Sequence, residues 1–188
     1  MPFAEYMPYR EFFRAITSQV DLLERDFVPG HEVGVVPVAT DSGATIRAGL
    51  GICFEVAIDH VLRDTIDAGA NLLVIQTNNA MFDLSAESAQ QLAISRVRAV
   101  EYGRSVVHAS NVGISALITP DGVAHQATEL FTPAILAGDL PLRTELTLAT
   151  RLGPWPDRAL ALAALVGLAL PLLRRRRAQV VPRSPSLD

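Results

Sequence analysis

A short, uninterrupted apolar run, NLLVIQTN, at residues 71–78 limits the folds that this chain can adopt. A strand buried on both faces of a sheet has this composition, whereas a strand with one solvent-exposed face alternates apolar and polar residues. A helical pattern precedes the run. Ile58, Val61, Leu62 and Thr65 repeat at helical spacing, and Gly69 closes that helix.

The surrounding segments complete an α/β pattern. Residues 32–53 form two predicted strands around the turn Asp41-Ser42-Gly43, and the second strand ends at Cys53. Ser85 can cap a helix that ends at Gly103. Its residues Ala89, Leu92, Ala93, Val97 and Val100 fall on one side. Four strand-like segments follow, SVVHAS, GISALIT, VAHQA and AILAGDL, with a turn at Pro120-Asp121-Gly122. This order predicts a layered α/β fold with a mixed sheet.

Composition narrows the function. The chain has 188 residues, enough for one domain with a core, and a net charge of −4, which argues against a general nucleic-acid binder. A single cysteine excludes an internal disulfide. The sequence has no HExxH, no CxxC and no clustered His/Asp spacing, so we expect neither a metal nor another cofactor. All 16 basic residues are Arg, so no ε-amine is available for chemistry.

The C-terminal region contains an uncharged run, residues 159–173, followed by four Arg at 174–177. A spanning helix usually needs about 20 apolar residues, and Trp155 can add an interfacial anchor. We therefore predict a transmembrane helix over residues 152–174, with a buried core helix as the alternative. The Arg cluster would mark the cytoplasmic side, with a disordered cytoplasmic tail at 175–188 and residues 1–150 on the opposite side.

Cys53 lies where the second strand meets the following helical pattern, in the stretch GLGICFEV. At a helix N-terminus, unpaired N–H groups favour a thiolate and can stabilise an oxyanion when the thiolate attacks an acyl carbon. Gly49 and Gly51 would keep the approach uncrowded. The alternative is a small buried hydrophobic side chain. None of the four histidines, His31, His60, His108 and His125, forms a recognisable pair with the cysteine.

Four blocks in order carry a family resemblance. They are PFAEYMPYREFF, GICFEV, QTNNAMFD with the following QLAISRVRAVEYGRSVVHASNVGISALITPDGV, and the apolar segment after RLGPWP. These blocks resemble the apolipoprotein N-acyltransferases, membrane members of the nitrilase (carbon–nitrogen hydrolase) superfamily. The resemblance implies a partial nitrilase-like αββα sandwich over residues 1–150, followed by one C-terminal transmembrane helix. It also implies location in the bacterial inner membrane, with the catalytic domain on the extracytoplasmic side.

The resemblance implies ping-pong acyl transfer. The cysteine takes a fatty acyl group from a phospholipid as a thioester and passes it to the N-terminal amine of a diacylglyceryl-cysteine lipoprotein. By motif, Cys53 is the nucleophile, and Glu5 and Glu55 match two glutamates of the family's site. Phe54, Asn78, Asn79 and Met81 match substrate-binding positions. Phe54 replaces a common Tyr, Asn79 a common Asp, Met81 a common Trp and Asp83 a common Gly. Glu101 is interpreted as structural.

One part of the family pattern is missing. The superfamily uses a Glu-Lys-Cys triad whose Lys and Glu lie upstream of the PF-E segment, and this sequence has no Lys. We therefore expect the C-terminal part of an N-acyltransferase, inactive alone. Two alternatives stay open: a fragment of a soluble nitrilase-type amidase, or a non-catalytic membrane-anchored remnant that pairs with a chain supplying Lys and Glu.

Overall fold

The computed structural model describes residues 6, 8–17, 20, 26, 28, 30–40 and 43–179, with side chains up to residue 170. It divides into two compact units, residues 1–34 and residues 35–188. In the first unit, helix α1 (Arg10–Arg14) is the helix described, and Arg10 forms an ion pair with Asp26. Glu5, like residues 41–42 of the predicted hairpin turn, lies outside the described residues.

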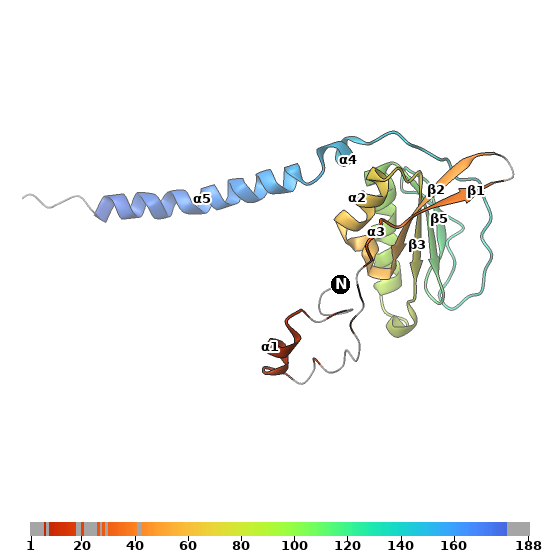
Figure 1. Cartoon of the computed structure of the whole chain (residues 1–188), viewed down its shortest axis with the longest axis horizontal. Helices are drawn as coiled ribbons and strands as arrows, with labels where there is room; N and C mark the ends of the chain where they lie inside the picture. The colour runs from red at the N-terminus through yellow and green to blue at the C-terminus, as the bar shows by residue number, and fades with distance from the viewer. Residues whose placement is uncertain are drawn as a thin grey trace, which may run out of the picture. The chain divides into compact units, whose positions relative to one another are not determined.

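The second unit contains one six-stranded mixed sheet in the order β1-β2-β3-β4-β5-β6 (Figure 1). The strands are β1 (Val35–Ala39), β2 (Thr45–Ile52), β3 (Leu72–Thr77), β4 (Ser105–Ser110), β5 (Ala116–Ile118) and β6 (Ala124–His125). Strands β2, β3 and β4 run parallel, while β1, β5 and β6 pair antiparallel with their neighbours. The predicted mixed sheet is confirmed.

Two helices provide the parallel crossovers. Helix α2 (Asp59–Asp67) connects β2 to β3, and helix α3 (Glu87–Tyr102) connects β3 to β4. Two short 3-10 helices precede them, η2 (Cys53–Ala57) and η3 (Ala80–Phe82). The hydrophobic core lies between these helices and the sheet. Its fully buried residues include Val56, Leu62, Leu73, Ile75, Tyr102, Val106 and Ile118.

Gly49 and Gly51 have a different role from the one expected. A Cβ on Gly49 would lie 2.6 Å from Thr65 Oγ1, and one on Gly51 would lie 3.0 Å from Leu62 Cδ2, both side chains of α2. Helix α2 therefore packs directly onto the backbone of β2, which only glycine permits. The absence of side chains at Gly49 and Gly51 allows α2 to pack against β2, and this packing, not access to Cys53, explains the two glycines.

The side of α3 that carries the apolar residues is not the buried side. Val97 and Val100 are 62% and 53% exposed. The buried residues are Ser88, Gln91, Ser95, Ala99 and Tyr102, which are mostly polar. The helix begins at Glu87, and its N-cap is Ala86 rather than the predicted Ser85, although Ser85 Oγ accepts a hydrogen bond from Glu87 N at 3.4 Å. The periodicity located the helix but not the side that faces the sheet.

The chain after β6 differs from the prediction. The segment AILAGDL, residues 134–140, forms no strand, because it pairs with no neighbour in the sheet. Helix α4 (Leu148–Leu152) and helix α5 (Trp155–Gln179) follow. Within the described part of the chain, no helix reaches the length and hydropathy needed to cross a membrane. Residues 180–188 of the predicted tail lie outside the described residues.

Candidate functional site

Cys53 occupies a sharp corner directly after β2. Its φ angle is 53°, in the left-handed region that non-glycine residues adopt at a cost of about 1–3 kcal/mol. Its side chain is partly exposed. A nucleophile on a strained strand-to-helix turn is the arrangement known as a nucleophile elbow. The element that follows is the five-residue η2 and not an α-helix, so the helix-dipole argument made from the sequence has less support.

The carboxylate of Glu55 closes this corner. Glu55 Oε2 accepts a hydrogen bond from the backbone N–H of Ile52 at 2.7 Å. This bond joins the last residue of β2 to the middle of η2 and spans Cys53. The bond therefore gives Glu55 a structural contribution to the shape of the corner.

The carboxyl ends of the parallel strands carry a buried polar cluster beside Cys53. In open α/β sheets, this edge is where ligands bind. The cluster consists of Thr77, Asn79, Ser88, Gln91 and Ser110. Asn79 Nδ2 donates to Ser88 Oγ at 2.9 Å and to Gln91 Oε1 at 3.1 Å. Asn79 Oδ1 accepts from Thr77 Oγ1 at 2.6 Å and from Ser110 Oγ at 3.3 Å.

Gln91 connects this cluster to the cysteine. Gln91 Nε2 lies 3.9 Å from Cys53 Sγ. No role is predicted for Gln91 from the sequence, although it is the first residue of the QLAISRV block that carries the family resemblance. It also repeats with Ser88 and Ser95 along one side of the predicted helix.

The four positions matched to substrate binding fall into two groups. Asn79 is 1% exposed and belongs to the buried cluster. Asn78 is exposed, and its Oδ1 accepts hydrogen bonds from Asn111 Nδ2 and Ala80 N. Phe54 and Met81 are also exposed, Met81 at 92%. Buried Asn79 can order the site, whereas the exposed side chains of Asn78, Phe54 and Met81 are available to contact a bound molecule.

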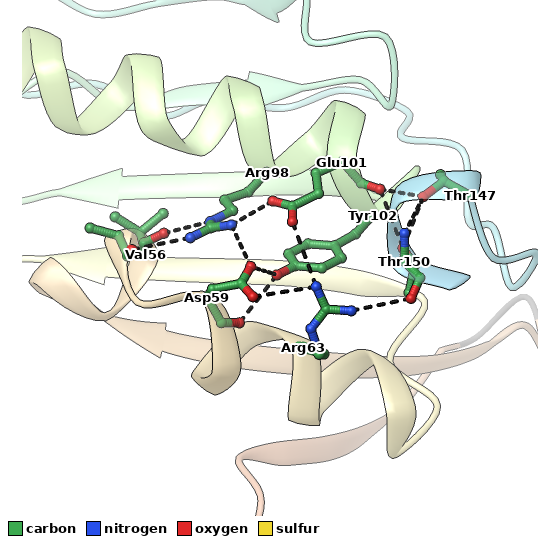
Figure 2. A network of polar contacts seen from close by, with 9 residues as sticks. Val56, Asp59, Arg63, Arg98, Glu101, Tyr102, Thr147 and Thr150 are labelled. Atoms are coloured by element: carbon green, nitrogen blue, oxygen red, sulfur yellow. Dashed lines mark hydrogen bonds and ion pairs between the residues drawn. The ribbon is translucent and has the colours of Figure 1, made fainter. Parts of the chain in front are cut away.

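A second polar network supports the backbone after Cys53, as Figure 2 shows. Arg98 on α3 donates to the carbonyl oxygens of Val56 and Ala57, at 2.9 and 3.1 Å, and forms ion pairs with Asp59 and Glu101. No sequence pattern predicts a role for Arg98. The structural interpretation of Glu101 agrees with its ion pair to Arg98.

The same network reaches α4. Arg63 donates to the carbonyl oxygen of Thr150 at 3.1 Å, and its guanidinium pairs with Asp59 (Figure 2). Thr147 caps α4 by accepting from Thr150 N, and its hydroxyl also donates to the carbonyl oxygen of Glu101. These contacts join η2, α2, α3 and α4 into one framework.

Electrostatics keep the groups of this network in fixed protonation states. Partial burial opposes ionisation of Asp59, but the hydrogen bond from Tyr102 and the charges of Arg63 and Arg98 hold its pKa below the usual value. Burial raises the pKa of Tyr102, so its hydroxyl stays protonated and donates to Asp59 Oδ1 at 3.1 Å. The network is therefore ion-paired at neutral pH.

The histidines take no part in this geometry. His108 is 1% exposed, and its Nδ1 lies 2.8 Å from Ser95 Oγ. Its Nε2 is the one buried side-chain N or O atom without a partner among the described residues. Burial lowers the pKa of His108 to about 4. The described residues also contain no group of three His, Cys, Asp or Glu side chains that could hold a metal ion.

Comparison with known proteins identifies the family. The carbon-nitrogen hydrolase family model matches residues 3–146. An apolipoprotein N-acyltransferase of Mycolicibacterium smegmatis is 42% identical over 176 residues, which is 94% of this chain and 28% of that protein. One of Azotobacter vinelandii is 33% identical over 182 residues, covering 97% and 34%. A solved amidase of the nitrilase superfamily from Nesterenkonia AN1 covers 57% of this chain and 41% of its own, at 21% identity and a TM-score of 0.45.

The chain spans roughly a third of the length of these apolipoprotein N-acyltransferases, 28% of one and 34% of the other. The family match accounts for the observed elements, a mixed α/β sheet whose cysteine lies at the carboxyl edge of its parallel strands. The resemblance predicted from the four sequence blocks is confirmed. This chain belongs to the carbon–nitrogen hydrolase family, and its acyltransferase relatives within that family are apolipoprotein N-acyltransferases.

Proposed function

We propose that this chain is the C-terminal part of an apolipoprotein N-acyltransferase in which Cys53 carries the acyl group. The observation that carries the proposal is the position of Cys53. A partly exposed thiol sits at a strained corner, beside a buried polar cluster, in a chain whose relatives bear that name. At this corner after β2, the thiolate of Cys53 is accessible and can act as a nucleophile.

The proposed reaction has two halves. The Cys53 thiolate attacks the ester carbonyl carbon of a phospholipid, a C–S bond forms, and the ester C–O bond breaks as the lysophospholipid leaves with a proton. The N-terminal amine of a lipoprotein's diacylglyceryl-cysteine then attacks the thioester. An N–C bond forms, the C–S bond breaks, and the thiolate returns while the amine loses a proton. A thioester is reactive enough to acylate an amine.

The proposed catalytic set needs residues from elsewhere. The sequence contains no Lys, so this chain cannot supply the electrostatic clamp that the family resemblance implies. Loss of one such contact to the developing charge costs about 10²–10³ in rate. We therefore propose that the chain alone is inactive and that a segment bearing Lys and Glu completes the site.

A partly uncovered sheet face supports this incompleteness. Helices α2 and α3 cover one face of the sheet. On the opposite face Leu50, Val74 and Val107 are half-buried, and Val36 and Val38 of the edge strand β1 are 44% and 43% exposed. Half-exposed apolar strands are typical of a sheet that a second layer covers. The αββα sandwich that the resemblance implies would provide that layer.

We also propose that the C-terminal helix attaches the domain to the bacterial inner membrane. Exposed apolar side chains surround the described part of α5, among them Leu160, Leu162, Leu165 and Leu168. A helix that is apolar all round belongs in a protein core or a bilayer. Arg174–Arg177 would lie on the cytoplasmic side and the catalytic domain on the other. The proposed phospholipid donor and lipoprotein acceptor both reside in that membrane, so the attachment would keep the catalytic domain close to both substrates.

The test uses a chimera, because the chain lacks Lys. The segment of the Mycolicibacterium smegmatis relative that precedes the matched region is joined to this chain and expressed in bacteria depleted of their own enzyme. We expect mass spectrometry to detect N-acylated lipoprotein with the chimera, none with its Cys53→Ala variant, and none with the 188-residue chain alone. The matched control, His60→Ala at an exposed position, should keep activity.

Either of two results would contradict the proposal: acylation by the Cys53→Ala chimera, or acylation by the chain alone at the rate of the chimera. Membrane fractionation tests the attachment separately. The chain should remain with the membrane after a high-salt wash and move to the soluble fraction when residues 155–188 are removed.

A further inference from the structure

Gln91 is a buried polar side chain that no sequence motif assigned to the site. It is 2% exposed and projects from α3 toward the corner that carries Cys53. Burying an amide costs free energy unless its groups find partners. The partners of Gln91 are Thr77 and Asn79 at one end of the amide and Cys53 at the other.

The cluster determines which end of the amide faces the sulfur. Gln91 Oε1 accepts from Asn79 Nδ2 at 3.1 Å and lies 2.9 Å from Thr77 Oγ1. Rotating the Gln91 amide alone would place its NH₂ group against the NH₂ group of Asn79. The assigned orientation follows from this network, as amide orientations generally do. It directs the NH₂ group of Gln91 at Cys53 Sγ, 3.9 Å away.

The cluster is also closely packed. Asn79 forms hydrogen bonds with Ser88 and Ser110 as well as with Gln91. A Cβ on Gly113 would lie 2.5 Å from Ser110 Oγ and 2.9 Å from Ser88 Oγ, so the backbone at Gly113 packs directly against the cluster. A donor held in place needs no reorganisation when charge develops on its acceptor.

We propose that Gln91 is a further catalytic residue whose amide N–H donates a hydrogen bond to the Cys53 thiolate. The inference rests on the proposed function. Sulfur carries negative charge twice in that reaction, as the attacking thiolate and as the thiolate that leaves the thioester. A donor to the charged form favours it over the neutral thiol.

The test measures thiol reactivity rather than acyl transfer. The purified 188-residue chain in detergent is alkylated with iodoacetamide from about pH 5 to about pH 10, and the pH midpoint of the rate reports the thiolate. In Gln91→Met, which keeps length and loses the donor, we expect the midpoint to rise by about one pH unit and the rate at pH 7 to fall roughly tenfold. In Gln91→Glu, which adds negative charge, the rise should be larger.

The matched control is Gln90→Met, the same change at the adjacent exposed position on α3. It should leave the midpoint unchanged. Thermal unfolding is followed in parallel, and Gln91→Glu preserves the side-chain shape if Gln91→Met loses stability. A purely structural Gln91 would change the melting temperature and leave the midpoint of the folded variant where it was. An unchanged midpoint in either folded variant overturns the inference.

The two proposals fail separately. A raised midpoint in the Gln91 variants, together with a chimera that acylates without Cys53, would remove the proposed function and leave Gln91 as a thiolate donor. A chimera that depends on Cys53, together with unchanged midpoints, would remove only the role of Gln91.

Discussion

Arg98 Nε donates a hydrogen bond to the carbonyl oxygen of Val56 at 2.9 Å, three residues beyond Cys53. The same guanidinium donates to the carbonyl of Ala57, where η2 ends. A five-residue 3-10 helix has poor hydrogen-bond geometry of its own, so its shape depends on such outside contacts. Through η2, the side chain of Arg98 fixes the corner on which the thiol sits.

Replacing Arg98 by Ala should destabilise the fold by about 2–3 kcal/mol, because it removes the donors to the carbonyls of Val56 and Ala57 and the ion pair with the partly buried Glu101. Asp59 keeps its contacts with Arg63 and Tyr102. Arg98→Lys keeps the charge but loses the fork of donors, so we expect an intermediate loss. Denaturant unfolding measures both. The control is Arg151→Ala at an exposed position on α4, expected within about 0.5 kcal/mol of the parent. Equal stability of Arg98→Ala and Arg151→Ala would refute the assignment.

Two variants of Glu55 distinguish a structural role of its carboxylate from a catalytic one. Glu55→Gln keeps an oxygen that can accept from Ile52 N, whereas Glu55→Ala removes it. If the carboxylate only closes the corner, Glu55→Ala should lose about 1 kcal/mol of stability and Glu55→Gln much less. The chimera should then keep most of its acyl transfer in Glu55→Gln. A large loss of activity in a stable Glu55→Gln chimera would instead indicate that the charge takes part in catalysis.

His108 should make the fold sensitive to mild acid. Burial lowers its pKa to about 4 in the folded protein, from the ordinary histidine value of 6.5. Between these two values the unfolded chain binds a proton that the folded one does not, so stability rises with pH across this window. As pH falls from about 6.5 to about 4, the loss should approach about 3 kcal/mol.

The variant His108→Leu removes the titrating group and should flatten the dependence of unfolding free energy on pH in that window. His60→Leu, at an exposed position on α2, is the control and should retain the slope. A slope that persists in His108→Leu would mean that other groups cause it.

Gly49→Ala tests the close approach of α2 to β2. The new methyl group would meet Thr65 Oγ1 at 2.6 Å and Ala70 Cβ at 2.9 Å, so the helix must shift. Overpacking of this kind costs about 1–3 kcal/mol, measured by thermal or denaturant unfolding. The control is Gly167→Ala in α5, where a Cβ meets nothing within 4 Å and helix propensity improves. Unchanged stability in Gly49→Ala would show that the helix can move without loss.

Local sequence patterns predicted the parallel strands, the two crossover helices and the corner at Cys53. The apolar run at 71–78 became β3, and the segment before Gly69 became α2. The prediction failed for AILAGDL, because an apolar segment becomes a strand only when a neighbouring strand satisfies its backbone. It also failed for the buried side of α3, since hydrophobic periodicity takes no account of a polar cluster beneath the helix.

Local sequence patterns are enough to predict most strands and helices, the place of the one thiol after β2, and the absence of any Lys. The residues around that thiol depend instead on how the chain folds in three dimensions. Gln91 and Cys53 are 38 positions apart, and Arg98 and Val56 are 42 apart. Such pairs meet because parallel strands return through crossover helices to one edge of the sheet, and no local pattern encodes which polar side chains arrive there.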